Sequence, residues 1–450
     1  MSDFKHQNPI TEGVIWKQLL IFFFPILVGT LVQQLYNTAD AVILGRFVGK
    51  EALAGVGGSA AVITTLIVGF FTGLATGASV IVSQFYGAKD SKNLQKSLHT
   101  AYAFSILFGI VISILGYLLT PWLLEITNTP ADIFDDTSMY LKIYFAGMLF
   151  TMIYNMGSSI LRAIGDSKRP LYYLIVCCFL NIGLDILFVI IFPFGVTGAA
   201  IATVLSQAVS AVLVTYALMK YYTTIRLELR SIRIHPSILK SEFRIGLPSG
   251  LQACMYGISN IVIQTSVNEF GTDVTASWAA YGKIDAIFWT ILAAFGVAIT
   301  TFCGQNLGAE RYDRIKKSIR VCLAMTFGTS LILCSFLYIA CRPLYAIFTT
   351  DKAVIDLGVY MLRLIMPSYL VYVFVEIIAG ALRGVGDVLF PTLITLGGVC
   401  FVRIPWVMFV VPNHHNVETL LYSYPMAWTA TAILLIIHYM KNRKKIFHIK

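Results

Sequence analysis

The sequence predicts an all-α polytopic membrane protein with twelve transmembrane helices, and three observations lead to that prediction. Of the 450 residues, 57% are hydrophobic and only 12% are charged, and the mean hydropathy is +0.77. Soluble domains carry about 25% charged residues. The apolar residues also form long continuous runs, whereas barrel strands alternate in character over about ten residues. Such a composition excludes a disordered chain, and the length excludes a small disulfide-rich secreted domain.

A membrane-spanning helix needs about 20 mostly apolar residues, and the sequence contains twelve stretches of that kind. The first six predicted spans are 18–45, 54–82, 100–121, 138–161, 171–192 and 196–219. The second six are 244–268, 277–302, 321–341, 358–382, 391–411 and 419–440.

The distribution of basic residues predicts the orientation of these spans. The chain ends and the loops on their side of the membrane hold 25 of the 33 Lys and Arg residues, whereas the opposite loops hold four. Lys and Arg concentrate in cytoplasmic loops. We therefore expect a multi-pass protein of the plasma (inner) membrane with both termini in the cytoplasm. The net charge of +10 then reflects contact with the lipid bilayer, not with nucleic acid.

Two short patterns recur at a constant offset of 221 in residue number. Gln84–Ala88 matches Gln305–Ala309, and Leu161–Asp166 matches Leu382–Asp387. A constant offset across this length indicates a duplication of six spans. Because six is an even number, both halves enter the membrane from the same side, which makes the repeat parallel.

The repeat predicts two six-helix lobes around a central cleft. We expect an N-terminal lobe at 1–220, a cytoplasmic linker at 221–243 and a C-terminal lobe at 244–450. Two facing lobes are a common plan among alternating-access transporters.

Polar residues within the apolar spans are the candidate functional residues, because an ionised Asp at mid-span costs about 2.5–3.5 kcal/mol. The first span places four of them on one helical face, namely Gln33, Tyr36, Asn37 and Asp40. Asn181 and Asp185 form an i,i+4 pair in the fifth span, and Thr203 lies in the sixth. At 1.5 Å per residue, Asp40, Asp185 and Thr203 all lie about 9–12 Å inside the predicted outer helix ends. The sequence thus predicts that Asp40, Asn181, Asp185 and Thr203 share one level.

The second half does not repeat this cluster. The offset of 221 converts Asp40 into Ile261 and Asp185 into Trp406. It instead places Glu376 opposite Asn155 of the first half, with Arg403 in the eleventh span. Glu376 and Arg403 either pair with each other or line a water-filled cavity. Lys283 and Asp285 in the eighth span are equally compatible with a structural and a functional role.

No motif of a common enzyme is present. The sequence lacks a GxxxxGK[ST] phosphate loop, an HExxH metal motif and a GxSxG nucleophile elbow. None of the eight Cys residues forms a CxxC pair. We therefore predict neither an enzyme nor a cofactor, and no metal beyond a possible coupling sodium ion.

Several stretches resemble the multidrug and toxic compound extrusion (MATE) family, in the same order along nearly the whole chain. They are Pro25–Asp40, Gln84–Ala88, Leu161–Asp166, Gly195–Thr203 and Gly304–Ala309. The NorM branch has a carboxylate within span 7, whereas span 7 here has Gln252 and no acidic residue until Glu269 near its outer end. The chain therefore looks more like the DinF branch.

The resemblance implies export of amphipathic organic cations, driven by a proton or sodium gradient. It also implies that Asp40, Asn181, Asp185 and Thr203 bind the coupling ion, that Tyr36, Asn37 and Asn155 line the cavity, and that the helix bends at Pro25. Two carboxylates, an amide and a hydroxyl suit either a proton or a hard cation such as sodium. The protein is expected to act as a monomer. Two other functions are compatible with the sequence, namely a lipid-linked oligosaccharide flippase and, with less support, an intramembrane enzyme.

Overall fold

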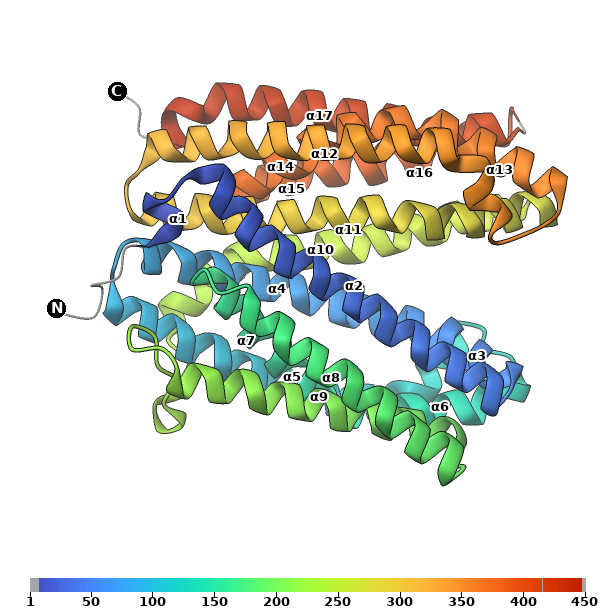
Figure 1. Cartoon of the computed structure of the whole chain (residues 1–450), viewed down its shortest axis with the longest axis horizontal. Helices are drawn as coiled ribbons and strands as arrows, with labels where there is room; N and C mark the ends of the chain where they lie inside the picture. Colours follow the sequence, from blue (N-terminus) through green and yellow to red (C-terminus); the bar gives the residue numbers. More distant parts are fainter. Residues whose placement is uncertain (1–7, 415, 447–450) are drawn as a thin grey trace. The chain divides into compact units, whose positions relative to one another are not determined.

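The computed structural model describes residues 8–414 and 416–446, and this part of the chain is helical without a β-strand (Figure 1). Ten helical segments within it are long and apolar enough to cross a membrane. They contain ten of the twelve predicted spans. The other two predicted spans, 138–161 and 244–268, also fall on helices, one of them interrupted and the other more polar. The predicted all-α membrane class is therefore confirmed.

The helices of the first half follow the order of the predicted spans. They are α1 (Pro9–Glu12), α2 (Ile15–Phe47), α3 (Lys50–Gly55), η1 (Val56–Ala60), α4 (Ala61–Gly87), α5 (Ser91–Ile126), α6 (Ala131–Ala146), α7 (Met148–Ala163), α8 (Lys168–Asp185), η2 (Ile186–Ile191) and α9 (Gly195–Lys220).

The remainder of the described chain begins with a short 3-10 turn in the linker. Its elements are η3 (Leu229–Ser231), α10 (Pro236–Asn268), α11 (Thr272–Gly308), α12 (Tyr312–Ala346), α13 (Lys352–Ile365), η4 (Met366–Ser368), α14 (Tyr369–Gly384), α15 (Leu389–Leu396), η5 (Gly397–Val402), α16 (Arg403–Pro405), η6 (Trp406–Val410) and α17 (Val417–Ile446).

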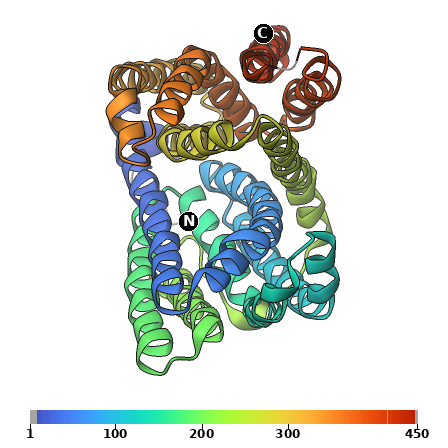
Figure 2. The same ribbon diagram turned by 90° about the vertical axis from the view of Figure 1, so that its right-hand side faces the viewer.

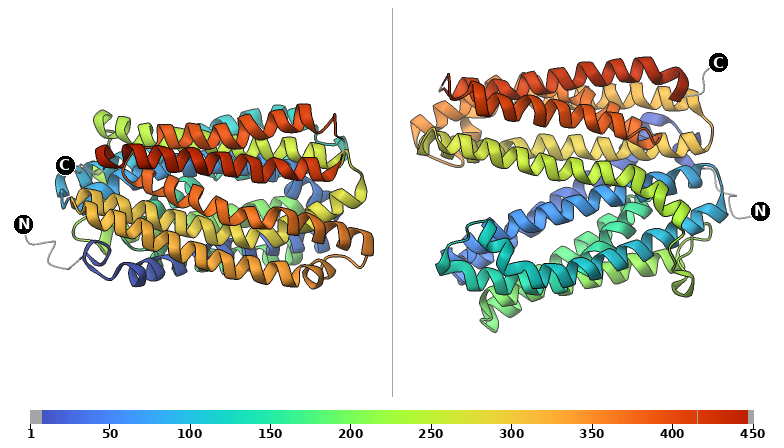
Figure 3. Two further views of the ribbon diagram at one scale, coloured as in Figure 1. Left: turned by 90° about the horizontal axis from the view of Figure 1, so that it is seen from above. Right: turned by 180° about the vertical axis from the view of Figure 1, so that it is seen from behind.

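The described chain forms two compact units. One unit contains Phe24–Gly250, and the other contains Asn8–Phe23 together with the chain from Leu251 onward. Helices α2 and α10 each pass from one unit to the other, and a proline lies near each crossing, Pro25 in α2 and Pro248 in α10. Within each unit the long helices run side by side, as Figure 3 shows from two directions and Figure 2 shows nearly end-on.

The backbone reproduces the internal repeat. Lys89 and Glu310, which the offset of 221 relates to each other, both adopt a φ of 56° directly after a helix. Gly165 and Gly386, related by the same offset, adopt φ values of 95° and 88°. A residue in the left-handed region just after a helix turns the backbone so that the next N–H groups bond to the last carbonyl oxygens of that helix. The matching sequence patterns are therefore matching helix ends, and the two repeated halves are confirmed.

A break in the helix explains why the predicted span 138–161 is not one continuous helix. It starts in α6 and ends in α7, with Gly147 between them. A Cβ atom at Gly147 would lie 2.4 Å from the side chain of Val204, so helix α9 approaches this point too closely for a larger residue. In the second half the break between α13 and α14 falls at η4, where Pro367 has no N–H to donate.

Candidate functional site

The predicted polar residues of spans 1, 5 and 6 meet within the first unit. The carboxyl groups of Asp40 on α2 and Asp185 on α8 lie close enough to each other to interact electrostatically. Asn181 and Asp185 are both 0% exposed. Cys177, one turn before Asn181, also lies within electrostatic reach of Asp40. Because Cys177, Asn181 and Asp185 are spaced by four, this face of α8 is turned toward Asp40.

Thr203 on α9 borders the same cluster. Its hydroxyl lies close to the hydroxyl groups of Tyr36 on α2 and Tyr140 on α6, and both rings lie within electrostatic reach of Asp40. The sequence analysis missed Tyr140. It is one of 23 tyrosines, and no spacing in the sequence distinguishes it from a tyrosine that only packs.

The polar atoms of this cluster are unusual because most of them have no hydrogen-bond partner in the described part of the chain. These atoms are Oδ1 of Asp40, Oδ1 and Nδ2 of Asn181, and both carboxylate oxygens of Asp185. No described Lys or Arg forms an ion pair with either carboxylate. Buried polar groups nearly always have a partner, so a group of orphaned oxygens indicates a place for a ligand. A proton or a small hard cation is the ligand that carboxylate and amide oxygens accept.

The other predicted residues of the first half have different settings. Gln33 and Asn37 lie on the exposed side of α2, and Tyr36 is half-buried. Asn155 is half-buried and donates from Nδ2 to the carbonyl of Thr151 on its own helix, at 2.8 Å. Pro25 lies inside α2, which continues through it as a helix.

The structure contradicts the predicted alternative that Glu376 pairs with Arg403. Arg383 donates from Nη2 to Oε1 of Glu376 at 3.0 Å, because it lies two turns further along the same helical face. Arg403 is 3% exposed and instead donates from Nη2 to Oδ1 of Asn260 at 3.3 Å. Its guanidinium carbon also lies 4.0 Å from the centre of the Tyr424 ring.

Asp285 on α11 is a further acidic residue of the second unit, and it lies well inside the predicted span 277–302. Its carboxylate accepts a hydrogen bond from the indole Nε1 of Trp289 at 2.6 Å and another from the Tyr369 hydroxyl. The Tyr369 hydroxyl also pairs with that of Tyr281. Both carboxylate oxygens of Asp285 therefore have partners, which favours a structural role over an ion-binding one. Asp185 lacks such partners, and the cluster around it is the stronger candidate site.

Repeated helical halves with an orphaned pair of buried carboxylates define a multi-span membrane transporter. The family model described as MatE matches residues 25–187 and 248–409, which is well over half of the chain and covers both halves. The chain therefore belongs to the MatE family, a family of transporters and not of enzymes. The branch within the family remains a prediction.

Individual relatives agree with this assignment. The chain is 28% identical over 443 residues to the probable multidrug resistance protein YoeA of Bacillus subtilis, covering 96% of this chain and 95% of YoeA. It is 30% identical over 307 residues to the probable multidrug resistance protein YpnP of the same organism, covering 68% of each chain. A solved MOP superfamily transporter from Pyrococcus furiosus has the same fold, with a TM-score of 0.90, 21% identity and 99% coverage of both chains. These relatives give no support to the flippase alternative.

Proposed function

We propose that the protein exports amphipathic organic cations by antiport with protons or sodium ions, through alternating access of its two halves. The single observation that carries this proposal is the orphaned carboxyl pair of Asp40 and Asp185 with the unpartnered amide of Asn181. Two relatives that are named as probable multidrug resistance proteins support the substrate class.

The pair of carboxylates accounts for the exchange. Two neighbouring acidic groups, buried and without a basic partner, strongly favour taking up one positive charge. A proton or sodium ion from outside would neutralise one carboxylate of the pair, Asp40, and release the bound organic cation outward. Loss of the ion to the cytoplasm would restore the negative charge and with it the affinity for the next organic cation.

The driving force follows from the charges exchanged. One proton exchanged for one monovalent cation moves no net charge, so the pH difference alone would drive export, at about 1.4 kcal/mol per pH unit. Asn181 and Thr203 supply the neutral oxygen atoms that a sodium ion would need beside the carboxylates.

Helix α2 is the element through which ion binding would act on the rest of the chain. It carries Asp40, and Pro25 removes one of its backbone hydrogen bonds two turns after the start of the predicted span. We propose that α2 bends at Pro25 when the Asp40 carboxylate is neutralised. In this proposal Gln33, Tyr36, Asn37 and Asn155 contact the substrate, whereas Glu376 and Arg403 keep their observed partners. The protein would act as a monomer with both termini in the cytoplasm.

Reconstituted vesicles test the proposal. The purified full chain is placed in vesicles, and uptake of ethidium is measured under an outward proton gradient or, separately, an outward sodium gradient. One of the two gradients is expected to accelerate uptake, and Asp40→Asn and Asp185→Asn are each expected to lower the initial rate at least tenfold.

Asp136→Asn is the matched control, because Asp136 is an exposed carboxylate on α6 of the same unit. It is expected to transport at the wild-type rate. Transport by Asp40→Asn at the wild-type rate, or uptake that neither gradient changes, would contradict the proposal.

A further inference from the structure

A cation stacked on a tyrosine ring occurs at the same place in both halves of the chain. The guanidinium carbon of Arg363 lies 5.0 Å from the centre of the Tyr338 ring, and Nζ of Lys142 lies 6.0 Å from that of Tyr117. The offset of 221 that relates the two halves converts Lys142 into Arg363 and Tyr117 into Tyr338. The repeat therefore keeps this pair although the residue types around it differ.

Arg363 carries a positive charge that no described acidic residue neutralises. The nearby Asp356, also on α13, is already paired with Arg342 of α12. Glu418, at the start of α17, accepts a hydrogen bond from Tyr360, one turn before Arg363. Arg363 is exposed and forms none of the described ion pairs.

The side of the second unit that carries Arg363 has the character of a lipid-facing surface. Ile332 and Ile339 of α12, on the same side as Tyr338, are 74% and 79% exposed. Arg363 lies little more than one turn inside the predicted outer end of its span, which is about 8 Å. A long basic side chain at this depth reaches the headgroup region of a bilayer by snorkelling.

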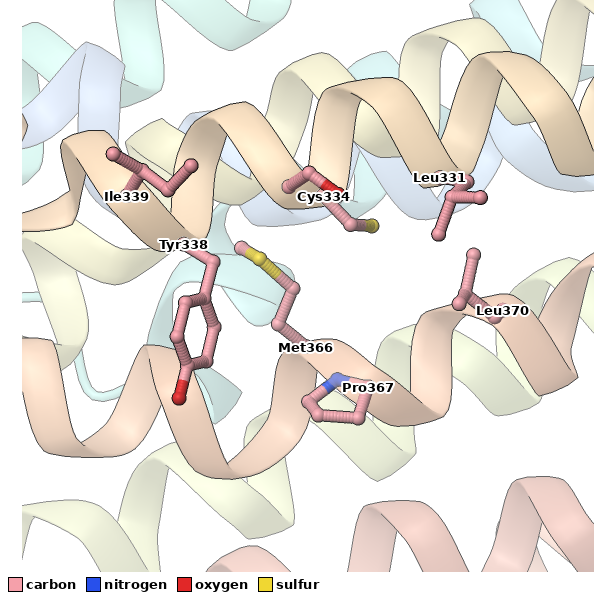
Figure 4. Close-up of a pocket in the computed structure, with 8 residues that line it drawn as sticks. Leu331, Cys334, Tyr338, Ile339, Met366, Pro367 and Leu370 are labelled. Carbon is pink, nitrogen blue, oxygen red and sulfur yellow. The ribbon is translucent and has the colours of Figure 1, made fainter.

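An apolar groove of about 330 Å³ is lined in part by Tyr338 (Figure 4), the ring over which Arg363 lies. Leu331, Ser335 and Tyr338 of α12 form one wall, and Met366, Pro367 and Leu370 form the other. The helix break at Pro367 opens the space between α12 and α14. Arg363 lies one turn before Pro367, and its guanidinium lies over the Tyr338 ring that lines the groove, so its charge is near the groove.

We propose that this surface binds a phospholipid of the outer leaflet, with its phosphate on Arg363 and one acyl chain in the groove. The planar guanidinium, held over the Tyr338 ring, can donate two parallel N–H···O hydrogen bonds to one phosphate in a bidentate arrangement. The apolar walls accept the hydrocarbon chain that continues inward from the glycerol. The inference is independent of what the protein transports.

Lys142 and Tyr117 form the corresponding site of the first half, and it binds the phosphate more weakly. The lysine ammonium is a compact point charge, whereas the planar arginine guanidinium binds a phosphate through two parallel hydrogen bonds. Phe145 stands at the position that corresponds to Met366, and its ring lies so close to α5 that a Cβ atom at Gly116 would be 2.3 Å from it. The ring thus occupies the space into which an acyl chain would otherwise insert.

Native mass spectrometry of the full chain in detergent tests the proposal, with long-chain phosphatidylglycerol as the probe. Wild-type protein is expected to retain one phosphatidylglycerol molecule at high affinity and a second at lower affinity. Arg363→Gln is expected to weaken the first binding step about fivefold or more, which corresponds to the loss of one basic residue near a lipid headgroup. Arg363→Lys is expected to restore part of the affinity.

Two further variants separate the headgroup from the groove. Ser335→Phe fills the groove without changing any charge, and it is expected to weaken binding of long-chain phosphatidylglycerol while leaving that of the dihexanoyl lipid unchanged. Arg342→Gln is the control, because Arg342 is already paired with Asp356, and it is expected to bind like the wild type. Melting temperatures measured alongside establish that each variant is folded.

Three results would overturn the proposal. They are an Arg363→Gln variant that binds phosphatidylglycerol like the wild type, equal retention of an uncharged diacylglycerol, and equal losses in Arg342→Gln and Arg363→Gln.

Discussion

The carboxyl groups of Asp40 and Asp185 lie close enough to interact electrostatically within one compact unit, and no described Lys or Arg pairs with either of them. Charge repulsion and burial both oppose ionisation of the pair. The arrangement therefore costs stability, and a protein retains such a cost where an ion or proton relieves it during function.

A double-mutant cycle should reveal this cost. Asp40→Asn and Asp185→Asn are each expected to raise the melting temperature in sodium-free detergent at pH 8, because either change removes the repulsion. The stability gained by the double variant should be smaller than the sum of the gains of the two single variants. The difference, the coupling energy between the two sites, is expected to be about 1 kcal/mol. Differential scanning fluorimetry provides the measurement. Additive gains would show that the two carboxylates do not interact.

Close packing between α4 and α10 gives a second prediction. A Cβ atom at Gly77 would lie 2.1 Å from the backbone oxygen of Glu242, and one at Gly73 would lie 2.4 Å from the backbone of Gly250. Gly77→Val is therefore expected to destabilise the protein by about 1–3 kcal/mol or more through overpacking, measured as a lower melting temperature.

Gly183 on α8 is the matched control for that variant. It is exposed, and a Cβ atom there would meet nothing within 4 Å. Gly183→Ala should stabilise the helix by about 0.5–1 kcal/mol, because alanine restricts the unfolded chain. If both substitutions changed the melting temperature alike, the contact between α4 and α10 would not be the cause.

The N-terminus of α5 predicts a dependence on pH. Asp90 accepts hydrogen bonds from the backbone N–H of Asn93 at 3.1 Å and from its Nδ2 at 2.7 Å, and these bonds lower the pKa of the Asp90 carboxyl below its usual range. A lowered pKa means that the cap stabilises the fold fully above about pH 4 and loses its effect as the pH falls through the folded-state pKa.

Asp90→Ala should accordingly lower stability by about 1 kcal/mol at pH 7, and the difference from the wild type should shrink toward pH 3. Asp313 serves as the control, because this exposed residue in the first turn of α12 accepts from Lys316 at 3.3 Å and from no other described residue. Asp313→Ala should change the melting temperature much less. A deficit of Asp90→Ala that stayed constant from pH 7 to pH 3 would contradict the capping role.

Arg314 holds the short helix α1 in place within the second unit. Its guanidinium donates to the carbonyl of Ile10 from Nε and Nη2, each at 3.0 Å, and also to the carbonyl of Gly13. Arg314→Ala is expected to accelerate hydrogen exchange of the Thr11 and Glu12 amides at least tenfold. Lys317→Ala, an exposed change one turn away, should leave their exchange unaltered, and protection that survived in Arg314→Ala would refute the role of these bonds.

Composition and periodicity were sufficient to predict the helical class and the repeat. Apolar runs of fixed length must be helical in a membrane because every backbone group needs an internal partner. The repeat could be recognised because Gly165 and Gly386 occupy left-handed backbone positions that few other residue types adopt. The common depth of Asp40, Asp185 and Thr203 also followed from helix rise alone, although their shared role in ion binding remains a prediction.

Side-chain partnerships within the second half could not be predicted in the same way. Glu376 pairs with Arg383 because both lie on one helical face, whereas the sequence made Arg403 an equally plausible partner. Asp285 accepts a hydrogen bond from the hydroxyl of Tyr369 on α14. Because Tyr369 is far away in the sequence, no short motif could predict this pair. Tyr140 enters the candidate site for a similar reason, since the helix break at Gly147 sets the position of α6.

The passage of α2 and α10 between the compact units makes the two halves depend on each other. Residues 8–23 of the first half belong to the unit built mainly from the second, and residues 236–250 of the second half belong to the unit built from the first. Each half thus supplies the first segment of the compact unit that is built mainly from the other half. Separately synthesised halves are therefore expected to regain their fold only when they are produced together.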